Sequence, residues 1–487
     1  MKAAFWAALV AYGVVMAALV GAVPGGSDTS GYFNEAHLFS HFRIHEATRA
    51  LPGVPADAAP PYLYVPLGFR PAPDAPAVLV PTYPPGLSLM LVPAAWVVGW
   101  RHSGDVIMVL HSLAGLVLLY ILGREFGLRP LWAFAGSAFL AASPLYIFMS
   151  LWAMSDVPAM VWATAAAIAA WKCRSRIPWA FAAGLCAGVG FLVRPSNFLM
   201  VVPMVVLIGW SPRRLLLAAL GGLPCITIWM AINHAAYGSF LQSGYGAIGG
   251  EFHKDLVKST LRFCIRWMPV AVSPVVMAAP LVAAIARSRT RIALSLIAWI
   301  CAYVAFYAPY RWTHEDWWFL RFLLPAVPAL LVAGLAGVQR LLDLLKGRVS
   351  EPARVWALGL LFAATVWTTA RQINPLHAWS IGSGEEKYGR IGEWLKNNVP
   401  GNAALIAMQY SGSDYYFSHN ILIRADELNA ETAERVRAAT RAEKRGVYAV
   451  IFPNEKEFIR KLPGKWTQLG AVDDVTIWGN DWNGPGS

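Results

Sequence analysis

A train of long apolar segments dominates this sequence and limits what the chain can fold into. Most of these runs approach the roughly 20 residues that a helix needs to cross a bilayer. With 57% hydrophobic and only 14% charged residues, the chain holds more continuous apolar sequence than a soluble core requires. The sequence therefore predicts a polytopic α-helical membrane protein with about eleven transmembrane helices. The eleven runs lie near residues 3–23, 105–122, 131–149, 157–171, 178–193, 197–210, 215–233, 265–286, 292–309, 322–338 and 355–370.

The first run follows Lys2 and ends in the small residues Gly21-Ala22-Val23. A cleaved signal peptide is one interpretation of this pattern. We expect a retained membrane anchor instead, because the run is about 20 residues long and further apolar runs follow it.

Charges in the connecting segments orient the predicted helices. With the N-terminus placed in the cytoplasm, the cytoplasmic segments carry 15 Lys and Arg against 3 Asp and Glu, which is the asymmetry expected for inner loops. The odd number of spans then puts the C-terminus on the extracytoplasmic side. This topology accounts for most of the net charge of +12, so the charge is no sign of nucleic-acid binding.

A large first extracytoplasmic loop is predicted at residues 24–104. Its apolar run at 86–100 follows Pro84-Pro85. Counting that run as a span would reverse every later segment and send the Arg-rich ones outside. We therefore expect interfacial or re-entrant helices in this loop, where protein groups satisfy the backbone. Residues 1–371, with the loop included, form the predicted membrane module.

Residues 372–487 form a second predicted domain, because no spanning run occurs there. Amphipathic stretches at 388–397 and 430–444 alternate with short apolar runs at 403–408 and 448–452. Such alternation predicts a small soluble α/β domain. The parity of the spans places this domain outside the cytoplasm.

Two acidic residues, Asp28 and Asp156, lie at predicted extracytoplasmic ends of spans. Carboxylates that converge from separate loops can supply a general base and either a metal ligand or a hydrogen-bond acceptor. Asp28 begins a predicted amphipathic helix that also carries Glu35. Non-catalytic alternatives stay open. Each carboxylate can lie in interfacial water, and Ser155 or Asp156 can be the N-cap of the span that begins at Pro158.

Arg194 and Arg321 are the candidate ligands for a lipid phosphate. Arg194 lies in a turn between two short apolar runs, so the turn can lie below the membrane surface, where an arginine is costly unless it is paired. Arg321 lies among aromatic residues at the mouth of a span. The alternatives are that Arg194 reaches the head groups, and that the aromatic residues form an interfacial belt rather than a sugar-binding surface.

The sequence gives little support for a metal or nucleotide site. His37, His41 and His45 are spaced by four residues and would share one face of a helix, but no carboxylate of matched spacing accompanies them. We find no nucleotide-phosphate loop, no dinucleotide fingerprint and no Gly-x-Ser-x-Gly motif. We therefore expect no nucleotide cofactor, and a leaving group should arrive on a lipid.

Several short motifs occur in an order that resembles one known family, the glycosyltransferase C superfamily. The nearest relatives seen in this resemblance are bacterial proteins similar to dolichyl-phosphate-mannose protein mannosyltransferases and lipid A aminoarabinose transferases. The resemblance covers most of the membrane part and extends to the C-terminal domain. The motifs are Ser27-Asp28-Thr29-Ser30-Gly31-Tyr32, Tyr83-Pro84-Pro85-Gly86, Asp156, Arg194-Pro195-Ser196-Asn197, Tyr237-Gly238-Ser239-Phe240 with Gly244-Tyr245-Gly246, and Arg321-Phe322-Leu323-Leu324-Pro325.

The resemblance implies transfer of a sugar from a polyprenyl phosphate carrier to an acceptor on the extracytoplasmic face of a bacterial inner (plasma) membrane, with inversion at the anomeric carbon. Asp28 matches the first-loop acid, which acts as base or orients the acceptor. Asp156 matches a second acid, which binds a divalent metal ion in some members of the family. For this chain the resemblance thus implies an Mg²⁺ or Mn²⁺ ion. One branch of the family has two acids in a row at this position, whereas Val157 follows Asp156 in this sequence. Arg321 matches the phosphate-holding arginine better than Arg194 does.

Glu35, Tyr83 and Tyr237 complete the predicted substrate-binding set. We expect Asp28, Asp156 and the phosphate-holding arginine to line one pocket that opens to the outer leaflet. The expected partners are the lipid-linked donor, a lipid, glycan or protein acceptor, and membrane lipids. A transporter or flippase for a lipid-linked or anionic substrate is the main alternative, although it predicts ionisable residues near mid-span and related halves. A membrane scaffold is a third interpretation.

Overall fold

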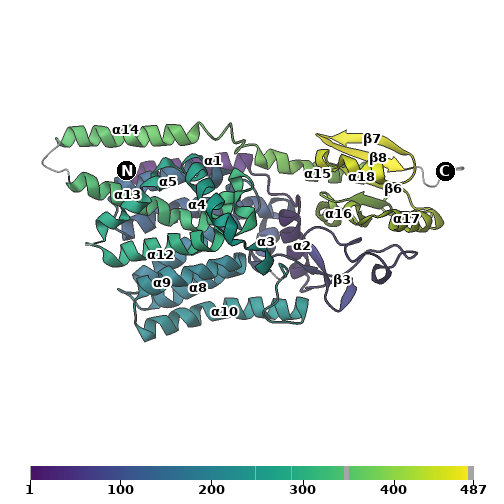
Figure 1. The fold of residues 1–487 in the computed structure, drawn as a ribbon, viewed down its shortest axis with the longest axis horizontal. Helices are drawn as coiled ribbons and strands as arrows, with labels where there is room; N and C mark the ends of the chain where they lie inside the picture. Colours follow the sequence, from purple (N-terminus) through teal and green to yellow (C-terminus); the bar gives the residue numbers. More distant parts are fainter. Residues whose placement is uncertain (1, 247, 287, 345–349, 481–487) are drawn as a thin grey trace. The chain divides into compact units, whose positions relative to one another are not determined.

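The computed structural model in Figure 1 describes residues 2–246, 248–286, 288–344 and 350–480. The chain splits into two compact units. The helical unit comprises Met1–Val20, Asp105–Ile228 and Ala247–Gly382, and the loop–tail unit comprises Gly21–Gly104, Trp229–Gly246 and Ser383–Ser487. The predicted boundary at residue 371 stays a prediction. The grouping of residues 21–104 with the C-terminal residues was not expected from the sequence.

Helices make up nearly all of the helical unit, and each predicted apolar run overlaps one helix or two consecutive ones. α4 begins and α10 ends in the other unit. The α-helices and 3-10 helices (η) that carry these runs are α1 (Lys2–Leu19), α4 (Trp100–Glu125), α5 (Pro130–Ala141), α6 (Pro144–Ser150), α7 (Asp156–Lys172), α8 (Pro178–Val193), η2 (Pro195–Met200), α9 (Val201–Ile208), α10 (Pro212–Tyr237), α11 (Val257–Ala271), η5 (Pro274–Ile285), α12 (Thr290–Tyr307), η7 (Trp317–Ala326), α13 (Val327–Leu344) and α14 (Glu351–Ala370).

Four helices among the described residues are long and apolar enough to cross a membrane: α4, α10, α12 and the continuous η7–α13 segment. The number becomes six if each of two bent pairs is one span. These pairs are α5–α6, bent by 63°, and α11–η5, bent by 109°. The other apolar helical stretches found in the described part of the chain are 10–17 residues long, so the predicted number of eleven spans stays a prediction.

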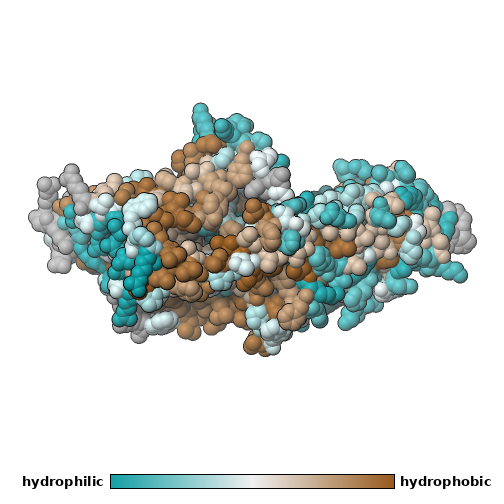
Figure 2. All heavy atoms as spheres, turned by 90° about the horizontal axis from the view of Figure 1, so that it is seen from below, coloured by the Kyte–Doolittle hydropathy of each residue, from teal (hydrophilic) through white to brown (hydrophobic). Residues whose placement is uncertain are grey.

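Large hydrophobic side chains lie exposed on this unit. Along α10, Leu216, Leu220 and Leu223 are between 45% and 60% exposed. Figure 2 shows hydrophobic side chains covering much of the helical part on the face that it draws. Soluble proteins rarely expose so much contiguous apolar surface, whereas helices of this kind are stable in lipid because their backbone groups bond internally.

The first-loop part of the loop–tail unit begins with α2 (Asp28–Ser40). Three antiparallel strands follow, β1 (Glu46–Ala47), β2 (Phe69–Ala72) and β3 (Ala75–Pro81), in the order β1-β3-β2. The expectation that α2 is amphipathic was wrong, because every residue from Thr29 to Ala36 is buried. α2 also ends before His41, so the three spaced histidines share no helix face.

α3 (Pro85–Val98) begins directly after Pro84, as predicted. Proline suits the first turn of a helix because its missing N–H has no partner to lose. With 14 residues, α3 is shorter than the roughly 20 that cross a bilayer. This length agrees with an interfacial or re-entrant helix.

The C-terminal residues form the predicted α/β domain. Its five-stranded sheet has the order β5-β4-β6-β8-β7, with β4 parallel to β5 and β6, and β8 antiparallel to β6 and β7. Residues 481–487 of the predicted domain lie outside the described residues. The elements are α15 (Ile381–Asn398), β4 (Ala404–Ala407), α16 (Ser411–Phe417), β5 (Ile421–Arg424), α17 (Ala430–Ala442), β6 (Val447–Ile451), η9 (Pro453–Glu455), α18 (Lys456–Lys461), β7 (Trp466–Val472) and β8 (Val475–Asn480).

Both faces of this sheet are covered, as parallel strands require. α15 packs on one face through Ile391 and Leu395. The other face is covered by α17 and also by first-loop residues, with Leu51, Val54 and Leu63 in the same apolar cluster as the strands. The first loop and the C-terminal domain therefore share one hydrophobic core. This shared core explains why the two segments form a single compact unit.

Candidate active site

Asp28 is half-buried in the first turn of α2, where the helix dipole favours negative charge. The Tyr83 hydroxyl donates a 2.7 Å hydrogen bond to Asp28 Oδ1. Ser27 Oγ lies 2.7 Å from the same hydroxyl, and Ser27 is the donor there because Tyr83 has only one proton to give. Burial and the Asp28 charge hold the pKa of Tyr83 well above its usual range, so the tyrosine keeps the proton that orients the carboxylate.

Two glycines allow the Tyr83 ring to reach Asp28. A Cβ atom on Gly31 would lie 2.5 Å from the Tyr83 ring and 2.9 Å from Gly68 Cα. Gly68 has a φ of +92°, and a Cβ atom there would lie 2.4 Å from Gly31 Cα. The two backbones thus approach more closely than a side chain permits. This approach places the motif that begins at Tyr83 beside the first turn of α2.

The last residue of α10 contacts the end of β3, and the segment after α10 contacts Tyr83. The Tyr237 hydroxyl donates a hydrogen bond to the Pro81 carbonyl. Tyr245 is 47% exposed, and its ring meets the Tyr83 ring at 73°, with centroids 6.2 Å apart. Two motifs that are distant in the sequence therefore bring tyrosines together near Asp28.

Glu35 is almost fully buried, with 1% exposed. Ser88 Oγ, in α3, lies 2.6 Å from Glu35 Oε2 and 2.9 Å from the Tyr32 carbonyl. Ser88 has one proton to donate, so both bonds form together when a neutral Glu35 donates to Ser88 and Ser88 donates to Tyr32. Burial raises the pKa of Glu35 to about 8. These contacts link α2 to α3, while the predicted role of Glu35 in substrate binding stays a prediction.

The buried carboxyl should make stability depend on pH. Folded Glu35 stays neutral up to about pH 8, whereas its ordinary pKa is 4.5, so the folded state binds an extra proton between these values. The free energy of unfolding should therefore fall as pH rises through this window. We expect thermal unfolding in detergent, measured from pH 5 to pH 9, to show a weaker fall for Glu35→Gln, which keeps a neutral donor to Ser88. Glu457→Gln, at an exposed pair with Lys461, should match the wild type; an unchanged slope for Glu35→Gln would contradict the assignment.

In the helical unit, Asp156 and Arg194 form an ion pair. Asp156 is the first residue of α7, and Arg194 follows the end of α8. Their side chains are 1% and 13% exposed, so the pair offsets the high cost of a buried arginine. Within the described residues the Ser155 side chain makes no capping hydrogen bond.

Asn197 fixes the turn that carries Arg194. Its amide nitrogen donates to the Ala159 carbonyl in α7 at 2.9 Å. Its oxygen accepts a 2.7 Å bond from the Tyr303 hydroxyl in α12. The turn after α8 is thus tied to two other helices, and this holds Arg194 beside the start of α7.

Arg321 lies in η7 among aromatic rings and is 9% exposed. Its guanidinium carbon is 4.9 Å from the ring centroid of Trp318, 5.6 Å from Phe319 and 5.3 Å from Phe322. Cation–π contacts of this kind stabilise a desolvated arginine. Arg194 lies 5.2 Å from the same Phe322 ring. The shared ring brings the two candidate phosphate ligands together.

The predicted site residues fall into two groups. The loop–tail unit holds Asp28, Glu35, Tyr83 and Tyr237, and the helical unit holds Asp156, Arg194 and Arg321. Contacts within each unit bring Tyr83 to Asp28, and Arg194 to Asp156 and to the ring that Arg321 contacts. One pocket shared by both aspartates stays a prediction.

The described residues do not fit a divalent metal ion. Asp156 Oδ2 has no hydrogen-bond partner among them, but the other oxygen is engaged by Arg194. No group of three or more His, Cys, Asp and Glu that could hold a metal occurs in the described ranges, whereas Mg²⁺ and Mn²⁺ favour several oxygen ligands. The predicted ion stays a prediction.

Comparison with solved structures gives the fold. The apo crystal structure of ArnT from Cupriavidus metallidurans aligns with a TM-score of 0.61 at 14% identity, over 100% of both chains. ArnT, a lipid A aminoarabinose transferase, belongs to the glycosyltransferase C superfamily. The chain has the glycosyltransferase C fold. At the level of the fold, this confirms the resemblance that the order of the motifs indicated.

Two further structures with the glycosyltransferase C fold are similar. AglB oligosaccharyltransferase from Archaeoglobus fulgidus, in complex with an inhibitory peptide and a dolichol-phosphate, has a TM-score of 0.52 at 12% identity and covers 100% of this chain and 75% of its own. Arabinofuranosyltransferase AftD from Mycobacteria has a TM-score of 0.56 at 11% identity, over 99% of this chain and 40% of its own. No family profile and no curated protein sequence matches the chain.

Sequence reasoning missed several contacts around these residues in the glycosyltransferase C fold. Ser88, the partner of Glu35, carries no local signal because a serine in an apolar helix is common. Asn197 belonged to a recognised motif, but its bond to Tyr303 joins distant segments. Trp318 stood in a visible aromatic cluster, and its position next to Arg321 could have been proposed as a cation–π contact.

Proposed function

We propose that this protein transfers a sugar from a polyprenyl phosphate carrier to an acceptor on the extracytoplasmic face of the membrane, with inversion at the anomeric carbon. One observation carries the proposal: a half-buried Asp28 carboxylate oriented by Tyr83, in a chain with the glycosyltransferase C fold. The similar ArnT structure bound to undecaprenyl phosphate and the AglB complex with a dolichol-phosphate support the carrier class. The acceptor can be a lipid, a glycan or a protein.

The proposed reaction is a single displacement. Asp28 accepts the proton of the acceptor group as that group attacks the anomeric carbon. The bond between this carbon and the phosphate oxygen breaks, and the electron pair leaves with the phosphate. The products are the glycosylated acceptor and the free polyprenyl phosphate. Tyr83 keeps the carboxylate oriented, and a single displacement inverts the anomeric centre.

Arg321 is proposed to hold the carrier phosphate. Its contacts engage the ring faces of Trp318 and Phe322, and a stacked guanidinium can still bind phosphate oxygens in its own plane. Arg194 is the weaker candidate because its guanidinium pairs with Asp156. A fixed positive group where charge develops on the leaving phosphate lowers the barrier.

Arg321→Gln should lower kcat/KM for the lipid donor by about 10- to 150-fold, which corresponds to losing one charged hydrogen bond of about 1.5–3 kcal/mol. Steady-state kinetics with a polyprenyl-phosphate sugar measure this change. Arg321→Lys keeps the charge but loses the planar pair of N–H donors, so its kcat/KM should lie between those of the wild type and Arg321→Gln. Arg311→Gln removes a half-exposed arginine paired with Glu251 and should retain wild-type rates. Equal losses in both glutamine variants would argue against a phosphate ligand at Arg321.

The direct test of the reaction uses purified protein in nanodiscs with a panel of polyprenyl-phosphate sugars. Release of the polyprenyl phosphate is followed with and without acceptor extracts from bacterial envelopes. Turnover with at least one donor is expected. Failure with every donor, together with movement of the lipid-linked sugar between leaflets, would favour the transporter or flippase.

A further inference from the structure

The carboxyl edge of parallel strands is where open α/β sheets usually bind a ligand. In this domain β4 is the middle one of three parallel strands, with β5 and β6 on either side. Gln409 follows β4 at this edge, and Glu455 closes the turn after β6. The residues at this edge therefore indicate what the domain binds there.

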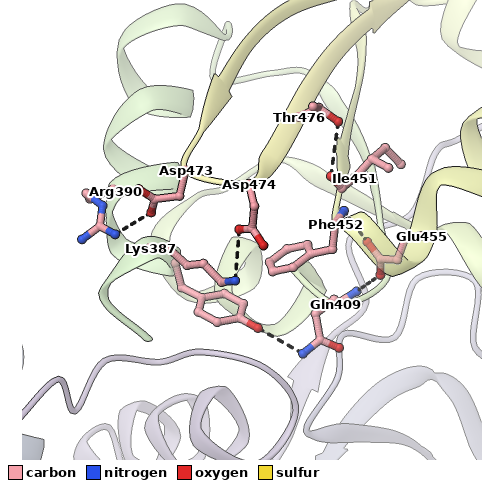
Figure 3. A network of polar contacts seen from close by, with 10 residues as sticks. Lys387, Arg390, Gln409, Ile451, Phe452, Glu455, Asp473, Asp474 and Thr476 are labelled. Atoms are coloured by element: carbon pink, nitrogen blue, oxygen red, sulfur yellow. Dashed lines mark hydrogen bonds and ion pairs between the residues drawn. The ribbon is translucent and has the colours of Figure 1, made fainter. Parts of the chain in front are cut away.

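Glu455 fixes the backbone at the edge of the sheet. Its Oε1 accepts a 2.7 Å bond from the Gln409 amide, and its Oε2 accepts a 2.9 Å bond from the Phe452 amide. Figure 3 shows both bonds, of which the one to Gln409 joins the turn after β6 to the turn after β4. Glu455 is 2% exposed, so both bonds are shielded from water. Gln409 therefore has a defined position from which its side chain reaches outward.

The Gln409 side chain leads to the residues before Asp28. Its amide nitrogen donates a 3.0 Å bond to the Tyr388 hydroxyl, and a Cβ atom on Gly26 would lie 3.3 Å from this nitrogen and 3.8 Å from the hydroxyl. The Tyr388 ring also packs against Gly25, where a Cβ atom would lie 2.6 Å from the ring. The edge of the sheet is thus occupied by the chain's own Gly25-Gly26 segment, directly ahead of the turn that carries Asp28.

α16 contacts the same region at two more points. Ser413 Oγ donates a 2.6 Å bond to the Pro24 carbonyl. The Asn34 amide of α2 donates a 2.9 Å bond to the Gly412 carbonyl. Asp28 lies between Pro24 and Asn34, so the C-terminal domain holds the chain on both sides of the carboxylate.

We infer that the C-terminal domain positions Asp28, and that Gln409 and Tyr388 are positioning residues that act through the Gly25-Gly26 segment. This inference rests on the proposed function of Asp28. Under this inference the domain contributes to the rate of the reaction by holding Asp28 in place. A displacement of about 1 Å at a reacting group can cost about 100-fold in rate.

The kinetic test uses Tyr388→Phe, which keeps the ring against Gly25 and removes the hydroxyl, and Gln409→Ala. Each should lower kcat by about 10- to 100-fold and leave KM for the lipid donor unchanged. The double variant should be no worse than the poorer single variant, because Gln409 and Tyr388 are bonded to each other and contact the same Gly25-Gly26 segment. Gln409→Asn, with a shorter reach, should not restore the rate.

Thr476→Val is the matched control. Thr476 donates to the Ile451 carbonyl at 3.3 Å in the same sheet, as Figure 3 shows, but it lies off the path to Gly26. This variant should have wild-type kcat. A wild-type kcat in Tyr388→Phe and Gln409→Ala, or an equal loss in Thr476→Val, would overturn the inference.

Hydrogen exchange tests the same link without any activity. In Tyr388→Phe and Gln409→Ala, amides of residues 25–32 should exchange faster, while those of β3 should keep wild-type rates. Unchanged exchange at residues 25–32 would also overturn the inference. If the wild type turns over no donor, the proposed function fails, and the exchange measurement still decides whether the domain holds this segment.

Discussion

Asp28→Asn is expected to lower the rate of sugar transfer by about 100- to 10,000-fold, the range for loss of a general base. The amide keeps the size of the side chain and can still accept the bond from Tyr83, but it cannot take a proton from the acceptor. The fall should appear in kcat with saturating donor, because the lipid phosphate is bound elsewhere. Release of polyprenyl phosphate measures it.

Two further variants are compared with Asp28→Asn. Asp57→Asn removes the charge of an exposed aspartate in the same loop and should leave the rate unchanged. Tyr83→Phe removes the donor that orients Asp28 and should cause a smaller loss than Asp28→Asn. If Asp28→Asn retains more than a tenth of the wild-type rate, Asp28 is not the base.

Breaking the Asp156–Arg194 pair on one side is expected to cost about 3–5 kcal/mol of unfolding free energy. Asp156→Asn leaves the Arg194 cation without its carboxylate, and Arg194→Gln leaves the Asp156 charge nearly fully buried. Thermal and denaturant unfolding of the purified protein in detergent measure both losses. Arg129→Gln is the control, because its pair with Asp343 is half-exposed at the arginine and such pairs contribute about 1 kcal/mol or less.

The double variant Asp156→Asn/Arg194→Gln distinguishes a role of this pair in stability from a role in catalysis. With both charges removed, much of the lost stability should return, since neither charge is left unpaired. If Asp156 only neutralises Arg194, the double variant also recovers transfer activity. A stable but inactive double variant would instead support the predicted catalytic role of Asp156. Additive losses in the double variant would show that the two side chains do not stabilise each other.

The membrane part of the fold was predictable because lipid imposes a simple rule. A helix that must satisfy its own backbone in an apolar solvent leaves a long apolar run in the sequence, and every predicted run overlaps a helix. The alternation after residue 380 likewise predicted the α/β domain, since both of its apolar runs became buried strands, β4 and β6. These signals are local, so one sequence is enough to read them.

The contacts that build the site were less predictable because they join distant segments. Tyr83 and Gly31 meet only because two backbones touch at Gly68, and no spacing in the sequence indicates this. Glu35 was placed in a predicted amphipathic helix, and its burial could not be foreseen because a carboxyl group is usually exposed; a neutral carboxyl can be buried with a partner such as Ser88. Arg194 was correctly predicted to need a partner, while the identity of that partner came from the fold.

The core shared by the first loop and the C-terminal sheet has a consequence for biosynthesis. Leu51, Val54 and Leu63 leave the ribosome hundreds of residues before Ile406 and Ala449, the strand residues that cover them. Domains generally fold as units during synthesis, but this one remains unfinished until the last helices have been inserted. The segment bearing Asp28 is therefore completed only after β4 and β6 have been made, and a nonsense mutation ahead of β4 is expected to leave Leu51, Val54 and Leu63 without the strands that they pack against.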